Sequence, residues 1–275
     1  MRKSNARIEI PGWFLLLLSA CLLSGCATMP SARPLPAQAK EWEKVALVEQ
    51  MILPPSLPTV PLLQAGIYRT AFSEIEADVV KLHQDRIDEY EEILGQQLSK
   101  SSPFTVLYGK ELLKVKAFKN MDPATVVTFE TTAAGRGDDS MVIPTRGYNF
   151  FDFTMDGVNP KKVFGANESP FLDAHAGSLA ALCKSLDVDS IVVAQFYIDT
   201  PGVNFLALGQ KNLTMTVAFF DRDGKLIQSG TARLRGINSS GGDLDAYTKT
   251  MDKYPELVGR LVQSLTMGLK KTGGE

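Results

Sequence analysis

The side chains best suited to nucleophilic chemistry are two histidines and one cysteine, His83, His175 and Cys183. His175 and Cys183 are eight residues apart in a segment whose leucine spacing predicts a helix. Eight residues of helix rise about 12 Å, whereas an activated thiol needs its imidazole base within about 3 Å. We therefore expect Cys183 to be a small buried hydrophobe and each histidine to lie at the edge of a core.

The residues that ligate metals do not show the spacing of a metal site. The two histidines fall on separate predicted helices, and no His-Glu-x-x-His motif is present. Asp221-Arg222-Asp223-Gly224 resembles part of a calcium loop but lacks the closing glutamate, so it predicts a turn between two strands. Phosphate and dinucleotide loops are also absent from the sequence. We expect no metal, no cofactor and no catalytic residue.

Two further polar motifs have plain structural interpretations. Asp187 and Asp189 lie between a predicted helix and a predicted strand, where they are expected to end the helix. Arg136-Gly137-Asp138 spells the integrin-binding tripeptide, but Gly-Asp is also common in turns.

Clustered aromatic residues are the best candidates for a binding surface. Tyr148, Phe150, Phe151 and Phe153 fall within six residues, and aromatic side chains dominate contact energies in interfaces. The alternative is an edge strand that buries alternate rings. Phe205, in the apolar loop 201–210, either joins the same partner-binding surface or closes the end of the core.

The N-terminus has the parts of an export signal: Arg2, Lys3 and Arg7 precede an apolar run over 13–23. That run is about half of the roughly 20 residues that span a bilayer. It ends in Leu23-Ser24-Gly25-Cys26, which resembles the lipobox of bacterial lipoproteins. The resemblance implies that residues 1–25 are cleaved, that Cys26 is lipidated and that the bilayer is a partner.

The residues that follow the lipobox bear on localisation. Ala27 stands where an aspartate tends to retain Gram-negative lipoproteins in the inner membrane, so the resemblance favours the periplasmic face of the outer membrane. Pro30, Pro34 and Pro36 predict that 26–42 is an extended, flexible linker of about 40 Å.

The charge balance argues against nucleic-acid partners. The chain has 29 Lys+Arg and 31 Asp+Glu, a net charge of −2. Loss of three cations and Glu9 with the signal would make it −4. No basic face is expected. With Cys26 lipidated, Cys183 is left without a disulfide partner.

The hydrophobic pattern predicts a single periplasmic α/β domain over 43–275, with a mixed β-sheet and helices packed on it. Helices are expected at 73–98, 169–186 and 255–269, and strands at 45–48, 104–108, 125–129, 191–197, 213–220 and 226–234. The prolines of 54–61 predict an irregular connection, and 114–168 is expected to be an irregular insertion.

The second half resembles a group of envelope proteins: the curli-secretion (CsgG-type) lipoproteins, the LpoB-type activators of penicillin-binding proteins and the amino-terminal domain of TolB. The likeness lies in Leu186-Asp187-Val188-Asp189-Ser190 before an apolar strand, and in the turn 221–224 between two strands. Nothing matches the hairpins that build the curli pore, so the resemblance implies an accessory or scaffolding role.

Three functional hypotheses remain open. The first is a non-catalytic binding or assembly factor that contacts envelope proteins or forms a homo-oligomer. The second is a hydrolase of envelope polymers that uses paired carboxylates about 5 to 10 Å apart. The third is a carrier of lipids or small molecules.

Overall fold

The computed structural model describes residues 32–53, 55, 57–58, 63–116, 127–131, 138–144, 160–164 and 169–269. Cys26, Tyr148, Phe150, Phe151 and Phe153 lie outside the described residues.

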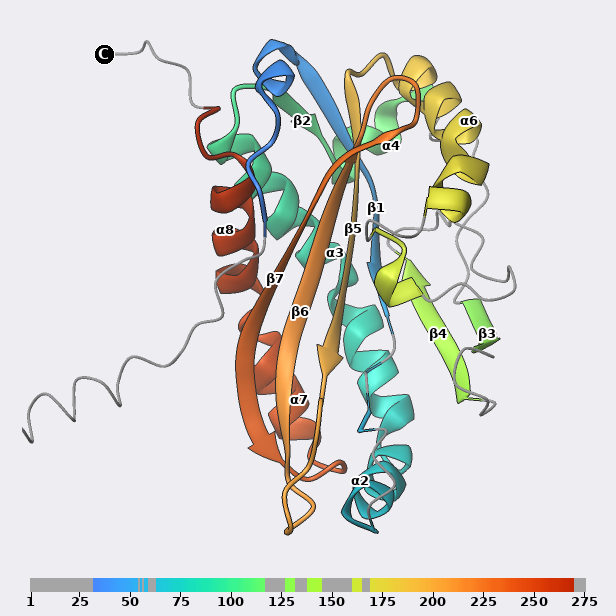
Figure 1. The fold of residues 1–275 in the computed structure, drawn as a ribbon, viewed down its shortest axis with the longest axis vertical. Coiled ribbons are helices and arrows are strands. Elements are labelled where there is room, and N and C mark those ends of the chain that lie inside the picture. The colour runs from blue at the N-terminus through green and yellow to red at the C-terminus, as the bar shows by residue number, and fades with distance from the viewer. Residues whose placement is uncertain are drawn as a thin grey trace, which may run out of the picture.

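A mixed sheet runs the length of the molecule (Figure 1), with strand order β3-β4-β1-β5-β6-β7 and β2 paired to β1. Its central strand β1 is parallel to β5 and β2, whereas β5, β6 and β7 are successively antiparallel. The strands are β1 (Lys44–Ile52), β2 (Thr105–Leu107), β3 (Val127–Thr131), β4 (Asp138–Pro144), β5 (Ser190–Asp199), β6 (Gly209–Phe220) and β7 (Leu226–Ser239). The α/β class and mixed sheet predicted from the sequence are therefore confirmed.

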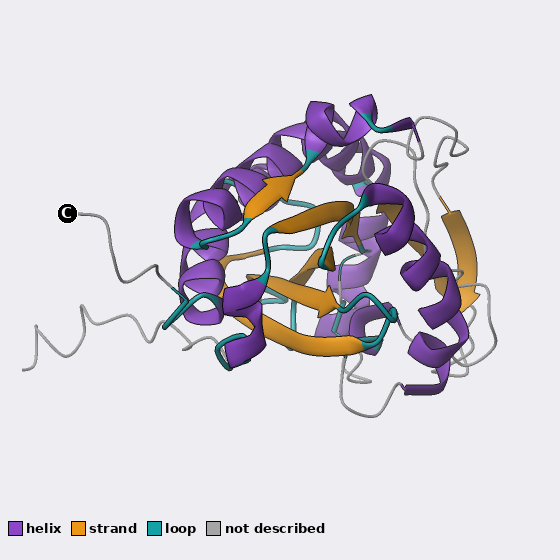
Figure 2. Ribbon diagram, turned by 90° about the horizontal axis from the view of Figure 1, so that it is seen from above, coloured by secondary structure: helices purple, strands orange, loops and turns teal. Residues whose placement is uncertain are grey.

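Helices cover both faces of this sheet (Figure 2). They are α2 (Leu63–Ser73), α3 (Glu76–Ser101), α4 (Gly109–Lys114), α6 (Ser169–Leu186), α7 (Leu244–Met251) and α8 (Tyr254–Leu265), with short 3-10 helices η1 (Ala37–Glu41) and η3 (Pro160–Lys162). No helix among the described residues is long and apolar enough to cross a membrane.

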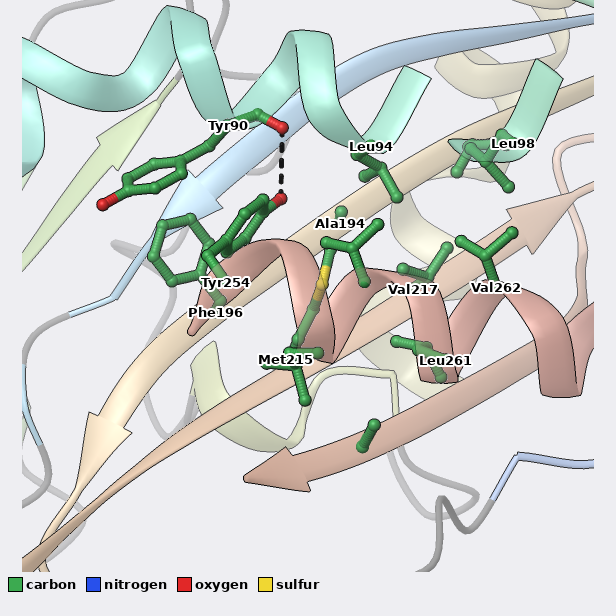
Figure 3. Close-up of a cluster of buried hydrophobic side chains, with 14 of the residues drawn as sticks. Tyr90, Leu94, Leu98, Ala194, Phe196, Met215, Val217, Tyr254, Leu261 and Val262 are labelled. Atoms are coloured by element: carbon green, nitrogen blue, oxygen red, sulfur yellow. Dashed lines mark hydrogen bonds between the residues drawn. The ribbon is translucent and has the colours of Figure 1, made fainter. Parts of the chain in front are cut away.

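The first face of the sheet packs against α3, α7 and α8. Alternate β5 residues such as Ala194 and Phe196 meet the buried stripes of these helices. Figure 3 shows the centre of this core, where the hydroxyl of Tyr254 donates a hydrogen bond to the Tyr90 carbonyl at 3.3 Å. The rings of Tyr90, Tyr254 and Phe196 lie within 5.0 Å of one another, centroid to centroid. Burial of these rings supplies much of the hydrophobic stabilisation of this layer.

The second face packs against α6, α4 and the segment 160–164. Ile191 and Val193 of β5 point to this side, opposite Ala194 and Phe196, as the alternation of a strand requires. Cys183 lies in this cluster, and burial raises the pKa of its thiol to about 11. The prediction that Cys183 is a buried hydrophobe is thus confirmed.

Asp189 joins three elements at one end of the sheet. Its carboxylate accepts hydrogen bonds from the backbone amides of Glu43 and Lys44 at 2.8 and 3.0 Å, and pairs with Arg222 at 2.6 Å. Asp187 just before it has a positive φ of 53° and terminates α6. Asp187 therefore ends the helix as expected, whereas Asp189 instead ties the start of β1 to the turn 221–224.

Three sequence expectations need correction. Helix α2 lies after the predicted irregular connection 54–61, in a stretch for which no helix was expected. Helix α3 begins at Glu76 and not at Ser73, whose hydroxyl donates to the Thr70 carbonyl at 2.7 Å instead of capping α3. The predicted irregular insertion 114–168 contributes β3 and β4, which extend the sheet. Residues 32–41, assigned to the linker, pack on the domain, because Leu35 and Ala39 are buried in its core.

Candidate partner-binding site

The hairpin between β5 and β6 ends in a tightly closed tip. The Asn204 amide donates to the Leu208 carbonyl at 2.9 Å, and the Ala207 amide donates to the Asn204 carbonyl at 3.0 Å. The Asn204 side-chain oxygen accepts from the amides of Leu206 and Leu208 at 2.9 and 3.1 Å. Ala207 takes the left-handed conformation, with φ of 56°, that this closure needs. The tip is therefore braced by its own hydrogen bonds.

This braced tip presents two large apolar side chains to solvent. Phe205 is 81% exposed and Leu206 is 62% exposed. Of the two expectations for Phe205, closing the core is therefore wrong, and an outward-facing surface is what the structure shows. Loop 201–210 contains no charged residue.

Helix α2 adds a second exposed apolar surface at the same end of the molecule (Figure 1). Leu63 is 78% exposed and Ile67, one turn later, is 53% exposed. The opposite side of α2 is buried through Tyr68 and Phe72. We call Leu63, Ile67, Phe205 and Leu206 together the apolar end.

The two parts of the apolar end are joined by close packing at the base of the hairpin. A Cβ on Gly209 would lie 2.9 Å from the ring of Tyr68, so only glycine allows β6 to approach α2 this closely. The Tyr68 hydroxyl also lies 3.4 Å from the hydroxyl of Thr200 at the end of β5. Helix α2 and the hairpin therefore form one rigid support for the exposed side chains.

A buried lysine holds the next layer of this support. The ammonium of Lys211 donates to the Ser239 hydroxyl and to the Ser240 carbonyl, the latter at 2.7 Å. It also lies 5.2 Å and 4.7 Å from the ring centroids of Tyr68 and Tyr247. Burial lowers the pKa of Lys211 to about 8, against the opposing attraction of Asp243.

A lysine beside a serine hydroxyl also resembles a base and nucleophile pair. Here both side chains are buried, and the ammonium already bonds the Ser240 carbonyl and faces two rings. This arrangement satisfies a buried cation. Its structural effect is to fasten the end of β7 to β6 beneath the apolar end.

Lys211 was not predicted as a site residue, although its position in the sequence is informative. Lys211 has the same strand parity as Leu213, Met215 and Val217, all of which face the helices. A lysine on the core side of a strand indicates a buried cation with dedicated partners.

The second face of the sheet carries a separate polar cluster. Asp199 and Arg233 form an ion pair between β5 and β7. The Lys161 ammonium lies 5.2 Å from the ring centroid of Tyr197, and burial lowers the Lys161 pKa to about 8. The Asp199 carboxylate pairs with Arg233 and also attracts Lys161, so the charges of this cluster are directed at one another.

The two histidines lie on opposite faces of the sheet and do not form a common site. His83 packs edge-on to Phe196 in the first core, and burial lowers its pKa to about 3. The His175 ring nitrogen lies 2.9 Å from the Phe171 carbonyl within α6. Across the part of the chain that the structure describes, no three His, Cys, Asp or Glu residues gather as a metal site would require.

The comparisons with known proteins give structural likenesses only. No protein-family model matches the chain, and no curated protein matches it. One similar solved structure is the PelC dodecamer from Paraburkholderia phytofirmans, with 11% identity and a TM-score of 0.31 over 86% of this chain and 99% of that chain. Another is lipoprotein GNA1162 from Neisseria meningitidis, with 14% identity and a TM-score of 0.25 over 77% of this chain and 96% of that chain.

Proposed function

We propose that this protein is a lipid-anchored periplasmic lipoprotein of the outer membrane that acts without catalysis, as a binding or assembly factor for envelope proteins. The observation that carries the proposal is the exposure of Phe205 and Leu206 on a hairpin tip braced by Asn204. The lipobox at 23–26 supplies the anchor and the compartment. The partner is another envelope protein or a second copy of the chain.

Exposing apolar side chains to water and ordering a loop each cost free energy. Contiguous apolar surface in contact with water is unfavourable, and on soluble proteins such patches often mark interaction sites. Fixing a loop in its binding conformation before association lowers the entropy lost on binding. The Asn204 hydrogen bonds fix this tip, and the packing of Gly209 on Tyr68 fixes its base.

The test is site-specific photo-crosslinking in living cells. A photoreactive phenylalanine analogue replaces Phe205 in the full-length chain, and the matched control carries it in place of Lys225. Lys225 is also exposed but lies in the turn between β6 and β7, at the other end of these strands. The proposal expects a discrete adduct from position 205 that is absent from position 225.

The partner identified in that adduct must also bind the unmodified protein. It should co-purify with the wild type and be lost with Phe205→Asp, while the variant keeps the wild-type melting temperature. Equal crosslinking at the two positions, or co-purification that Phe205→Asp leaves intact, would contradict the proposal.

A further inference from the structure

The segment that leads to the proposed lipid anchor is fixed on the domain as far as Ala32. The Ala32 carbonyl accepts a hydrogen bond from the Ser264 hydroxyl at 3.0 Å, and the Leu35 amide donates to the Leu265 carbonyl at 2.8 Å. A Cβ on Gly230 of β7 would lie 2.7 Å from that of Ala32. The N-terminal segment therefore lies against the last turn of α8 and against β7.

This docking limits how far Cys26 can lie from the domain. Six residue steps separate Cys26 from Ala32, and a fully extended chain covers at most about 3.5 Å per step. An acyl chain on Cys26 would thus hold Ala32 within about 20 Å of the bilayer surface. The sequence-based figure of about 40 Å assumed a free linker through residue 42.

The surface next to this attachment point has the chemistry of a bilayer contact. Met267, in the turn that follows α8, is 63% exposed and lies three residues beyond Ser264. Arg33 is exposed beside Ala32. An exposed apolar side chain and an exposed cation at the attachment point suit a membrane surface with anionic headgroups.

The apolar end lies far from this point along the sheet. Gly230, beside Ala32, is nine residues from Ser239, which pairs with Gly209 at the base of the hairpin tip. At about 3.3 Å per residue the two ends are roughly 30 Å apart.

From these placements we infer that the turn after α8, with Met267 and Arg33, is the surface that faces the anchoring bilayer. The occupant is the anionic lipid surface itself. The inference rests on the proposed lipidation of Cys26 and deepens the proposed function: it directs the partner-binding apolar end away from the lipid.

The test measures membrane proximity at two positions of the lipidated full-length protein. Met267→Cys and Phe205→Cys each receive an environment-sensitive fluorophore. Cys183 stays unlabelled because it is buried and its thiol pKa is raised to about 11. Each protein is reconstituted on phosphatidylethanolamine–phosphatidylglycerol vesicles with and without lipids spin-labelled near the headgroup.

The inference expects roughly twofold quenching of the label at position 267, because a side chain at the interface lies within the quenching layer, and none at position 205. Quenching at 205 with none at 267 would overturn it, as would equal quenching at both positions. Vesicle flotation of the wild type and Cys26→Ser tests the proposed lipid anchor separately from the inferred orientation. If both proteins float equally or neither floats, the anchoring proposal fails and the inference fails with it. If only the wild type floats, the quenching decides the orientation alone.

Discussion

The Lys211 ammonium lies 4.7 Å from the ring centroid of Tyr247 and donates a hydrogen bond to the Ser240 carbonyl at 2.7 Å. One cation thus connects the edge strand, a loop and the aromatic residue of α7 directly beneath the apolar end. Burial lowers the pKa of Lys211 to about 8. Removing this side chain should cost folding free energy, because its buried polar partners would be left without their donor.

Truncation of Lys211 should therefore destabilise the protein. Lys211→Ala leaves a cavity and deprives the Ser240 carbonyl of its donor, for an expected loss of about 2 to 4 kcal/mol in the free energy of unfolding. Lys211→Met retains the aliphatic stem and should lose only about 1 to 2 kcal/mol. Urea denaturation followed by circular dichroism measures both values. Two variants as stable as the wild type would show that the cation is not holding this region.

Two glycines in neighbouring helices should respond to alanine in opposite directions. A Cβ on Gly95 of α3 would lie 2.2 Å from the Tyr108 ring, whereas a Cβ on Gly66 of α2 would meet no atom within 4 Å. We expect Gly95→Ala to lower the free energy of unfolding by about 1 to 3 kcal/mol. Gly66→Ala should raise it by up to about 1 kcal/mol through helix propensity. Melting temperatures that shift in the same direction for both would contradict this packing.

The periodic elements were accessible from the sequence because burial repeats along them. The apolar run at 191–194 predicted a central strand, and the leucine and valine spacing of 257–265 predicted α8. Helix α2 was missed because its buried residues, Tyr68 and Phe72, are few and lie just after a proline-rich stretch. Local pattern cannot show that α2 is retained by packing on Gly209, a contact with the distant β6.

The candidate site was only partly predictable for the same reason. Phe205 stood out as an aromatic residue in an apolar loop, but whether it pointed inward or outward depended on how the loop closed. That closure is set by the Asn204 side-chain oxygen, which accepts hydrogen bonds from the Leu206 and Leu208 amides. The sequence alone does not show which hydrogen-bond partners an asparagine side chain has. The aromatic residues Tyr148, Phe150, Phe151 and Phe153 lie outside the described residues, so their proposed role stays a prediction.

Acid should weaken the fold through His83. Burial in the core, together with the nearby Arg86 guanidinium, lowers its pKa from 6.5 to about 3. Between pH 6.5 and pH 3, His83 is protonated in the unfolded chain but neutral in the folded protein. The stabilisation that is present above pH 6.5 is therefore lost as the pH falls toward 3. The loss is about 1.4 kcal/mol per pH unit.

His83→Met isolates this contribution, because it keeps an apolar side chain of similar size and removes the titration. The difference in unfolding free energy between wild type and variant should change across pH 6 to 4, a range within the titration window set by these two pKa values. Denaturant unfolding at several pH values measures it, and other acidic groups cancel in the difference. A difference that is independent of pH would mean that His83 is protonated in the folded protein.

Asn204 provides a way to separate the bracing of the tip from the contacts that the tip makes. Asn204→Ala removes the acceptor of the Leu206 and Leu208 amides but leaves Phe205 and Leu206 in place. If the tip binds as a pre-ordered surface, the partner identified by crosslinking should bind about 3- to 10-fold more weakly, because loop ordering must then accompany association. Phe205→Ser, which keeps the bracing and removes the ring, should weaken binding more, since aromatic anchors dominate interface energies. Titration calorimetry should also report a less favourable binding entropy for Asn204→Ala than for the wild type. If Asn204→Ala leaves binding unchanged and Phe205→Ser abolishes it, then Phe205 contacts the partner but the bracing by Asn204 has no role in binding.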